Sequence, residues 1–448
     1  MPSSDVVVVG AGLAGMTAAI ALADAGARVD VVARGHAATH WMSGGLDVAA
    51  PRGSVSSANG LARLASYPGH PYAFLHRDVR PAIDWLRAIL ATEGLTFAGD
   101  LDQPLRTVPT SIGATRRASL LPTAQAGALE PWKPDERLVV CGIAGFKDFW
   151  PGAIAASLER PWVWGGTTDA GDRRSPAAVE ALVVELPGIA GRRNLTALHL
   201  ARVFDDPAWR VEAFGVIAAA LRRRGPGPGR IALPAVLGLA DHGAAFDDAV
   251  RALPLIPFEV PLISPSVPGL RLFEALRAGL RRRGGRISVG EEVVRVETAG
   301  RRVTAVVAAA AARDRVFRTS GVVLATGGIA GGGLIGRADG TLVEPLLGLP
   351  VENPGAGEWL APDPFDPAGH RLEAAGIRTD AALHPVDGRG RVAFANVAIA
   401  GSLLAGQRYL TERCGDGVAV ASGRRAAAIF ALEGARPPTE RVKAGAGA

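Results

Sequence analysis

Runs of β-branched residues alternate with helix-forming stretches along most of the chain, and short glycine clusters separate them. The first run, residues 6–9, is valine at all four positions, which is typical of a strand buried on both faces of a sheet. Residues 16–25 are rich in Ala and predict a helix that ends at Gly26. Residues 29–32 predict a second strand. The start of the chain therefore predicts a complete β–α–β unit.

The later patterns extend this alternation. Helices are expected at 72–94, at 270–283 and at 414–433, whereas 95–136 is rich in turns. Further strands are expected at 138–141, 292–296, 302–307, 322–326 and 396–400, with mixed strand and helix patterns in 177–187, 207–224 and 230–240.

We predict an α/β chain with a Rossmann-like FAD/NAD(P)-binding flavoprotein fold and a large inserted α/β lobe. The nucleotide-binding part is residues 1–60. The inserted lobe, with a partner or substrate face, is 61–262. Residues 263–433 return to the first domain, and 434–448 form a flexible tail.

A glycine motif stands at the first turn of the β–α–β unit. Gly10 makes the tight turn, Gly12 lets backbone amides approach a phosphate, and Gly15 lets helix and strand pack closely. The helix N-terminus would then face an anion. The stretch expected to contact the phosphate is Gly10, Ala11, Gly12, Leu13, Ala14 and Gly15.

The second strand lacks the acid that usually binds an adenosine ribose. That place is Ala33, which cannot accept a hydrogen bond from a ribose hydroxyl; Arg34 and Gly35 follow it. Asp30 lies three residues too early. The phosphate site without the ribose acid favours FMN, with FAD as the alternative.

Small residues gather at the ends of the other predicted strands and at the start of the last helix. We expect them to line the flavin, because ligands of such sheets lie at the carboxyl ends of the strands. They are Ser43, Gly44, Gly45, Leu46, Val293, Ala325, Thr326, Gly327, Gly401, Ser402, Gly415, Gly417 and Val418.

Two side chains are candidates for chemistry. His40 is either a proton donor or flavin tether, or a packing histidine. Arg271 is either a fork for a substrate phosphate or carboxylate, or part of a surface ion pair. No residue pattern indicates a general base or a metal site.

Composition narrows the classes of function. The net charge is +6, but the basic residues are dispersed without interleaved aromatic residues, so no nucleic-acid binding is expected. Two cysteines cannot hold an iron–sulfur cluster. No apolar run reaches the length of a membrane span, and because a core strand is predicted from residue 5, no signal peptide is expected. We expect a cytoplasmic protein.

The chain resembles flavoproteins of the fumarate reductase/succinate dehydrogenase group in four ordered stretches: the glycine unit, the Ser-Gly-Gly loop, the Thr-Gly-Gly strand end and the C-terminal glycine helix. It is similar in more detail to the B-type subunits of anaerobic glycerol-3-phosphate dehydrogenase. The segments that carry this resemblance are 10–15, 34–35, 40–47, 142–149, 237–241, 265–272 and 414–418.

The resemblance implies a flavin-dependent oxidoreductase subunit, with FMN as its cofactor, that passes electrons from sn-glycerol 3-phosphate toward quinone. It implies as partners a catalytic FAD subunit and an iron–sulfur subunit, through which alone the chain would contact the inner face of the membrane. Two alternatives remain: a stand-alone FAD oxidoreductase of the fumarate reductase/aspartate oxidase type, and a non-redox structural subunit.

Overall fold

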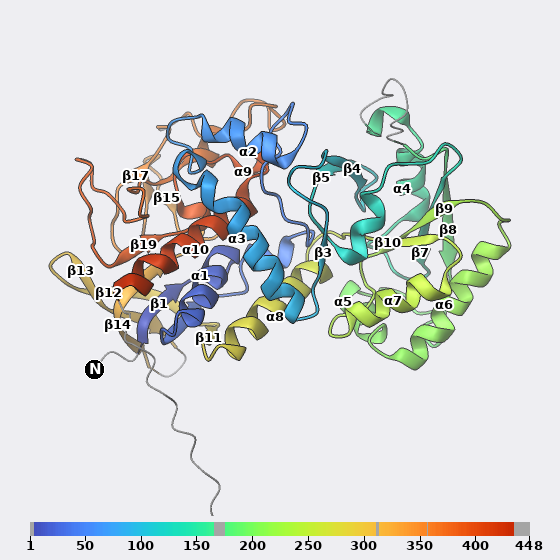
Figure 1. Cartoon of the computed structure of the whole chain (residues 1–448), viewed down its shortest axis with the longest axis horizontal. Helices are drawn as coiled ribbons and strands as arrows, with labels where there is room; N and C mark the ends of the chain where they lie inside the picture. The colour runs from blue at the N-terminus through green and yellow to red at the C-terminus, as the bar shows by residue number, and fades with distance from the viewer. Residues whose placement is uncertain (1–3, 165–174, 311–312, 356, 434–448) are drawn as a thin grey trace, which may run out of the picture.

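The computed structural model describes residues 4–164, 175–310, 313–355 and 357–433. Two sheets with separate hydrophobic cores lie side by side in the molecule (Figure 1). The predicted tail at 434–448 lies outside the described residues.

The first sheet has the strand order β11-β2-β1-β14-β13-β12, and β19 pairs with the carboxyl half of β14. Strands β11, β2, β1, β14 and β19 are parallel, while β12, β13 and β14 form an antiparallel meander. The seven strands are β1 (Ser4–Val9), β2 (Val29–Ala33), β11 (Arg286–Val289), β12 (Glu292–Ala299), β13 (Arg302–Ala309), β14 (Arg315–Leu324) and β19 (Val397–Ile399).

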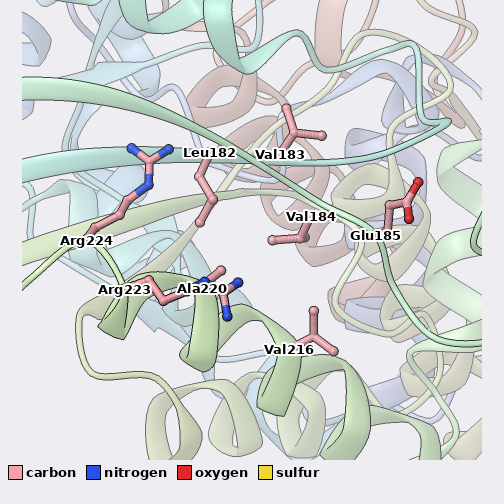
Figure 2. A pocket seen from close by; sticks show the side chains of 8 residues that line it. All are labelled: Leu182, Val183, Val184, Glu185, Val216, Ala220, Arg223 and Arg224. Carbon is pink, nitrogen blue, oxygen red and sulfur yellow. The ribbon is translucent and has the colours of Figure 1, made fainter.

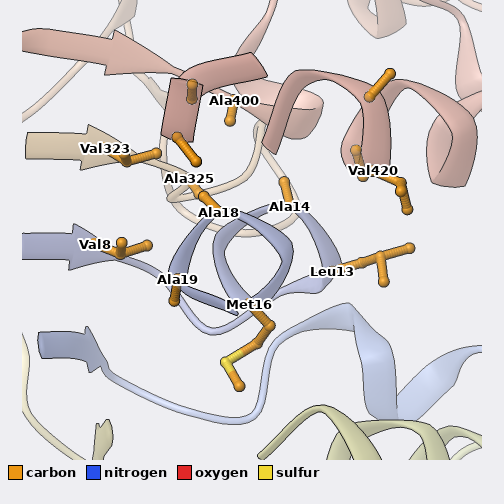
Figure 3. Close-up of a cluster of buried hydrophobic side chains, with 14 of the residues drawn as sticks. Val8, Leu13, Ala14, Met16, Ala18, Ala19, Val323, Ala325, Ala400 and Val420 are labelled. Atoms are coloured by element: carbon orange, nitrogen blue, oxygen red, sulfur yellow. The ribbon is translucent and has the colours of Figure 1, made fainter. Parts of the chain in front are cut away.

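Helices cover this sheet, and α1 is packed between it and α10 (Figure 3). Because α1 has apolar neighbours on almost every side, its sequence is apolar nearly all round rather than amphipathic. The helices of this part are α1 (Leu13–Asp24), α2 (Ser57–Ala65), α3 (Tyr72–Thr92), α8 (Val267–Arg282), α9 (Tyr409–Glu412) and α10 (Gly415–Glu433).

The second sheet is parallel, with the order β10-β9-β7-β8. Its strands are β7 (Arg137–Ile143), β8 (Ala178–Val184), β9 (Gly229–Pro234) and β10 (Ile256–Val260). Its helices are α4 (Pro151–Leu158), α5 (Ala197–Val203), α6 (Pro207–Arg222) and α7 (His242–Ala252). This is the inserted α/β lobe that the sequence predicts.

Short strands and 3-10 turns lie in the segments between the main elements. The strands are β3 (Phe97–Ala98), β4 (Arg106–Pro109), β5 (Thr115–Ala118), β6 (Leu121–Pro122), β15 (Ile335–Gly336), β16 (Leu342–Val343), β17 (Val351–Glu352) and β18 (Gly376–Ile377). The 3-10 turns are η1 (Ala38–Trp41), η2 (Thr123–Ala128), η3 (Pro161–Trp164), η4 (Arg371–Ala374) and η5 (Gly401–Leu403).

The chain passes from the first core to the second between residues 101 and 121, with Leu120 still in the first core. Buried side chains from Leu64 to Leu101 join the first core, and the second core begins at Val108. The domain division stays a prediction, but this packing favours a boundary later than residue 61, because the apolar face of α3 lies on α8 and α10.

Candidate functional site

The N-terminus of α1 lies at the carboxyl edge of the first sheet, at the point where the strand order reverses. From β1 the chain crosses to β2 on one side, and β14 occupies the other side, which makes this the switch point where such sheets bind ligands. Gly12 precedes α1 and no side chain caps the helix. The first-turn amides therefore remain available to an anion.

The three glycines of the motif have different surroundings. A Cβ on Gly10 would lie 2.2 Å from the Ala325 carbonyl oxygen, and one on Gly15 would lie 2.0 Å from that of Gly10. A Cβ on Gly12 would meet only the Ala37 methyl, at 3.5 Å. Gly10 and Gly15 thus permit close packing, whereas Gly12 leaves open space before the helix. This uncapped and uncrowded N-terminus fits a cofactor phosphate.

The end of β2 is occupied by contacts within the protein. The Ala33 carbonyl accepts hydrogen bonds from the amides of Gly290 and Glu291, at 2.8 and 3.2 Å. The Asp30 carboxylate binds Arg286, which lowers its pKa against the opposing effect of burial. Asp30 is therefore structural, as its place in the strand predicts.

Of three other residues expected near this edge, Arg34 and Val293 have neighbours within the protein. Arg34 pairs with Glu292 at 3.4 Å, and its guanidinium lies 3.3 Å from where a Cβ of Gly332 would be. Gly35 has open space around it, and Val293 is half-buried on β12. The end of β2 thus carries the Arg34 cation, and position 33 offers no acid.

The Ser43–Asp47 loop is held between the two parts of the molecule. The Gln125 amide donates to the Ser43 carbonyl at 2.8 Å, and the Leu46 amide donates to the Leu120 carbonyl at 3.0 Å. A Cβ on Gly44 would lie 2.6 Å from Pro268, and one on Gly45 would lie 2.6 Å from the Arg116 guanidinium. The two glycines are needed for this close packing.

The turns that follow β14 and β19 meet the end of β1 and the start of α1. The Ala325 amide donates to the Val9 carbonyl at 2.9 Å, and a Cβ on Gly401 would lie 2.7 Å from the Ala14 methyl. Ser402 accepts a hydrogen bond from the Gly328 amide at 3.3 Å. Thr326 and Gly327 lie in the same turn, and the buried Thr326 hydroxyl has no partner among the described residues. The predicted strand ends therefore lie together around the α1 N-terminus.

The start of α10 contacts the Ser43–Asp47 loop. The amides of Asp416 and Gly417 donate to the Asp47 carbonyl at 3.1 and 3.3 Å. A Cβ on Gly417 would lie 2.2 Å from the Tyr72 hydroxyl, so this glycine allows helix packing. Gly415 lies at the first position of α10, and Val418 is fully buried. Of the residues expected to line the flavin, Gly417 therefore uses its amide to hold this loop.

The carboxyl pair of Asp47 and Asp416, beside this loop, could not be predicted from the sequence. The Asp416 carboxylate accepts from the Asp47 amide at 2.8 Å, and Asp47 pairs with Arg116 at 3.0 Å. Burial raises the pKa of Asp416 to about 7, and the nearby Asp47 charge adds to the shift. Because Asp47 and Asp416 lie 369 positions apart, only the fold brings them together. The pair can hold a proton near neutral pH.

The contacts of the two predicted catalytic candidates, His40 and Arg271, indicate structural roles. The His40 ring stacks on His36 at 4.4 Å between centroids and meets the edge of Phe273; burial, with a smaller effect of His36, lowers its pKa. This placement favours the packing alternative. Arg271 is buried, with Nη2 3.0 Å from the Glu259 carboxylate and Nε 2.8 Å from the Gly238 carbonyl. Arg271 therefore joins α8 to the inserted lobe and does not form a surface ion pair.

His70, Glu412 and Cys414 bring three possible metal-ligand atoms within 4.8 Å of one another. The Nδ1 of His70 accepts from the Tyr72 amide at 2.9 Å, which leaves the proton of a neutral ring on Nε2, 3.2 Å from Glu412. Burial also raises the pKa of the Cys414 thiol. Metal ligands must be deprotonated, so this cluster is better described as a hydrogen-bonded network that joins α3 to α9.

Two cavities lie in the inserted lobe. One of about 440 Å³ lies between β8 and α6, with Leu182, Val184 and Val216 on its apolar side and Arg223 and Arg224 at its end (Figure 2). The other, of about 350 Å³, is bordered by Ile112, Trp150 and Ile263.

Comparison with known protein families and proteins agrees with a nucleotide site at the N-terminus of α1. Residues 5–418 match the family model described as FAD binding domain. The chain is 31% identical to the B-type subunit of anaerobic glycerol-3-phosphate dehydrogenase from Yersinia pestis, over 96% of this chain and 97% of that protein. The chain belongs to this family of B-type subunits. The predicted flavoprotein fold is thereby confirmed, and so is a flavin as the class of cofactor.

Other members of this family are similarly distant. The probable B-type subunit of anaerobic glycerol-3-phosphate dehydrogenase from Halobacterium salinarum is 30% identical, over 94% of this chain and 96% of that protein. Among solved structures, the open conformation of a flavocytochrome c3 fumarate reductase matches over 96% of this chain and 79% of that chain, with 11% identity and a TM-score of 0.44.

Across the described residues, no helix combines the length and apolarity that a bilayer crossing requires.

Proposed function

We propose that this chain is a flavin-carrying, electron-transferring subunit of a complex that oxidises sn-glycerol 3-phosphate to dihydroxyacetone phosphate. The uncapped N-terminus of α1 at the switch point carries the proposal, because it offers a phosphate site that the protein itself leaves open. The names of the relatives supply the substrate and the assembly. We further propose a catalytic FAD subunit and an iron–sulfur subunit as partners, and quinone as the final acceptor.

The residues of this chain would bind and position the cofactor. The amides at Gly12 to Ala14 would hold its phosphate, and the Ser43–Leu46 loop would lie against the ring system. A bound flavin supplies two-electron chemistry with substrate and one-electron chemistry with the acceptor. Asp416, which can keep a proton near neutral pH beside Asp47, would hold or release a proton close to that loop.

We propose FAD as the cofactor. The sequence favours FMN, because Ala33 stands where an acidic residue would bind the ribose of FAD. The family description names FAD, and the match extends from β1 to the start of α10, which includes both sides of the site. Heat-released cofactor from the purified protein should have the mass of FAD. Recovery of FMN alone would contradict this assignment.

A second function has one observation in its favour. A self-sufficient oxidoreductase needs a group that accepts a proton from its substrate, and the Asp47–Asp416 pair provides one. One anaerobic experiment separates the two functions.

The chain is purified alone under anaerobic conditions, sn-glycerol 3-phosphate is added, and the flavin absorbance near ~450 nm is followed. A relay subunit should stay oxidised until partner subunits are added. Bleaching of the isolated chain would instead establish a dehydrogenase in its own right. A colourless protein that takes up no added flavin would contradict both functions.

A further inference from the structure

Three large apolar side chains stand exposed around the smaller cavity of the inserted lobe. Ile112 is 73% exposed, Trp150 is 66% exposed and Ile263 is 60% exposed. They come from three separate segments: the turn between β4 and β5, the loop between β7 and α4, and the segment after β10. We call these three residues the apolar rim. Apolar residues gathered in this way, unlike scattered ones, mark an interaction site.

Packed elements hold the apolar rim in place. The β4–β5 turn closes with a hydrogen bond from the Thr110 amide to the Ala114 carbonyl at 2.8 Å. It lies against α4, since a Cβ on Gly113 would be 2.8 Å from that of Ser157. Trp150 directly precedes α4, and its carbonyl accepts from the Ile154 amide at 3.0 Å. Ile112 and Trp150 are therefore presented by ordered backbone.

Basic side chains accompany the apolar rim. Lys147 lines the same cavity as Asp148. The loop that carries the exposed Arg192 and Arg193 lies alongside, because the Leu195 amide donates to the Gly145 carbonyl at 3.1 Å. In the part of the chain that the structure describes, Lys147, Arg192 and Arg193 have no ion-pair partner. These two loops carry three cations, Lys147, Arg192 and Arg193, against the two anions Asp148 and Glu185, so their net charge is positive.

We propose that the apolar rim and Lys147 dock this chain on an anionic lipid surface. Trp prefers the boundary between headgroups and acyl chains, and basic residues beside it are attracted to anionic headgroups. Insertion would be shallow and would involve side chains of the rim only. This contact is made by the chain itself, in contrast to the expectation that membrane contact occurs only through partners. It does not depend on the proposed redox role.

The combination of residues favours lipid over a protein partner. Lysine is depleted in the cores of protein interfaces, whereas here Lys147 lies among the apolar residues. The rim also consists of separate projecting side chains on three segments, which suits a fluid surface that adapts to them.

The test measures binding of the flavin-loaded protein to vesicles by co-sedimentation. Wild-type protein should bind vesicles of phosphatidylglycerol mixed with phosphatidylcholine more strongly than vesicles of phosphatidylcholine alone. The triple variant Ile112→Ser, Trp150→Ser, Ile263→Ser should bind the anionic vesicles at least about tenfold more weakly, because three apolar contacts are lost. Lys147→Glu should weaken the same binding by at least about fivefold, because it removes one positive charge and adds one negative charge.

A matched control removes exposed apolar residues elsewhere. Leu360 and Phe365, 65% and 90% exposed, lie far from the rim in sequence, and the double variant Leu360→Ser, Phe365→Ser should bind like wild type. Retained flavin absorbance in each variant checks that the fold is intact. As a second readout, lipids with brominated acyl chains should quench wild-type fluorescence more than that of Trp150→Phe.

Wild-type protein that fails to bind anionic vesicles would overturn the proposal, and so would a triple variant that binds them as wild type does. Capture of a partner subunit through the rim, without vesicle binding, would reassign the surface to a protein interface and likewise overturn it.

Discussion

Gly12 and Gly15 lie three positions apart on the same turn but differ in their surroundings. Gly15 is enclosed, since any Cβ would collide with the Gly10 carbonyl, whereas Gly12 faces open space beside an uncapped helix. A side chain at position 15 would disturb the packing of α1 on β1. A side chain at position 12 would instead occupy the proposed phosphate site.

Replacing Gly12 with Asp should abolish flavin binding and leave the protein folded. The carboxylate would repel a phosphate, yet Asp is a favourable residue at a helix N-terminus. Flavin content after purification and urea unfolding report the two effects. Gly152→Asp is the matched control, because Gly152 lies in the first turn of α4 with nothing within 4 Å of its would-be Cβ. If the Gly12 variant keeps its flavin, the phosphate site is wrongly placed.

Asp416 should make stability depend on pH. Its pKa is raised to about 7 in the folded protein, so the folded state holds this proton more tightly than the unfolded chain does. The stabilisation is present below about pH 4 and is lost as the pH rises toward 7. Relative to Asp416→Asn, the wild type should lose on the order of 4 kcal/mol of unfolding free energy over this range. Urea unfolding at several pH values measures it, and parallel curves would rule out the raised pKa.

At the scale of elements, helix α8 joins the two parts of the molecule. Its N-terminal half contacts η1, and Arg271 reaches the Glu259 carboxylate at the end of β10, where both side chains are buried. Glu259 also accepts from the Leu237 amide at 2.8 Å, so the pair ties α8 to two strand ends of the lobe.

Removing one member of this pair should be more harmful than removing both. Arg271→Met leaves a buried, unpaired carboxylate and should cost about 3–5 kcal/mol of unfolding free energy. The double variant Arg271→Met, Glu259→Leu should recover most of that loss. Denaturant unfolding of the three proteins measures the difference. If Arg271 bound substrate instead, the single variant would lower activity and leave stability unchanged.

The elements were more predictable than the contacts between them. The β1–α1–β2 unit follows from local periodicity and glycine spacing, and the small residues at strand ends meet because parallel strands end at one edge. Arg271 and the Asp47–Asp416 pair could not be placed, because each owes its surroundings to a segment distant in sequence. The use of the α10 amides by Asp47 is likewise a consequence of tertiary packing.

At the scale of the whole molecule, two cores imply two units of stability. The first contains β1, β14 and the helices around α1, and the second surrounds β7 and β9. The predicted boundary at residue 61 assigned α3 by its position in the chain. Its buried face shows that it packs within the first core.

Added flavin should protect the first core and leave the second unchanged. Ligand that binds only the folded state stabilises it by about 2.7 kcal/mol at a concentration 100 times the Kd. Hydrogen exchange should therefore slow in peptides from β1 and β14 and remain unchanged in those from β7 and β9. Equal slowing in both would mean that the molecule unfolds as one unit.

The packing of α10 on α1 also fixes an order of events during synthesis on the ribosome. The inserted lobe is complete once β10 has emerged, whereas α1 gains its partner only when residues 415–433 have been made. At roughly 5–20 residues per second, the first helix waits roughly 20–80 s for the last one. The surroundings of the α1 N-terminus are therefore completed only late in synthesis, and until α10 packs the nascent chain exposes the apolar surface of its first helix to chaperones.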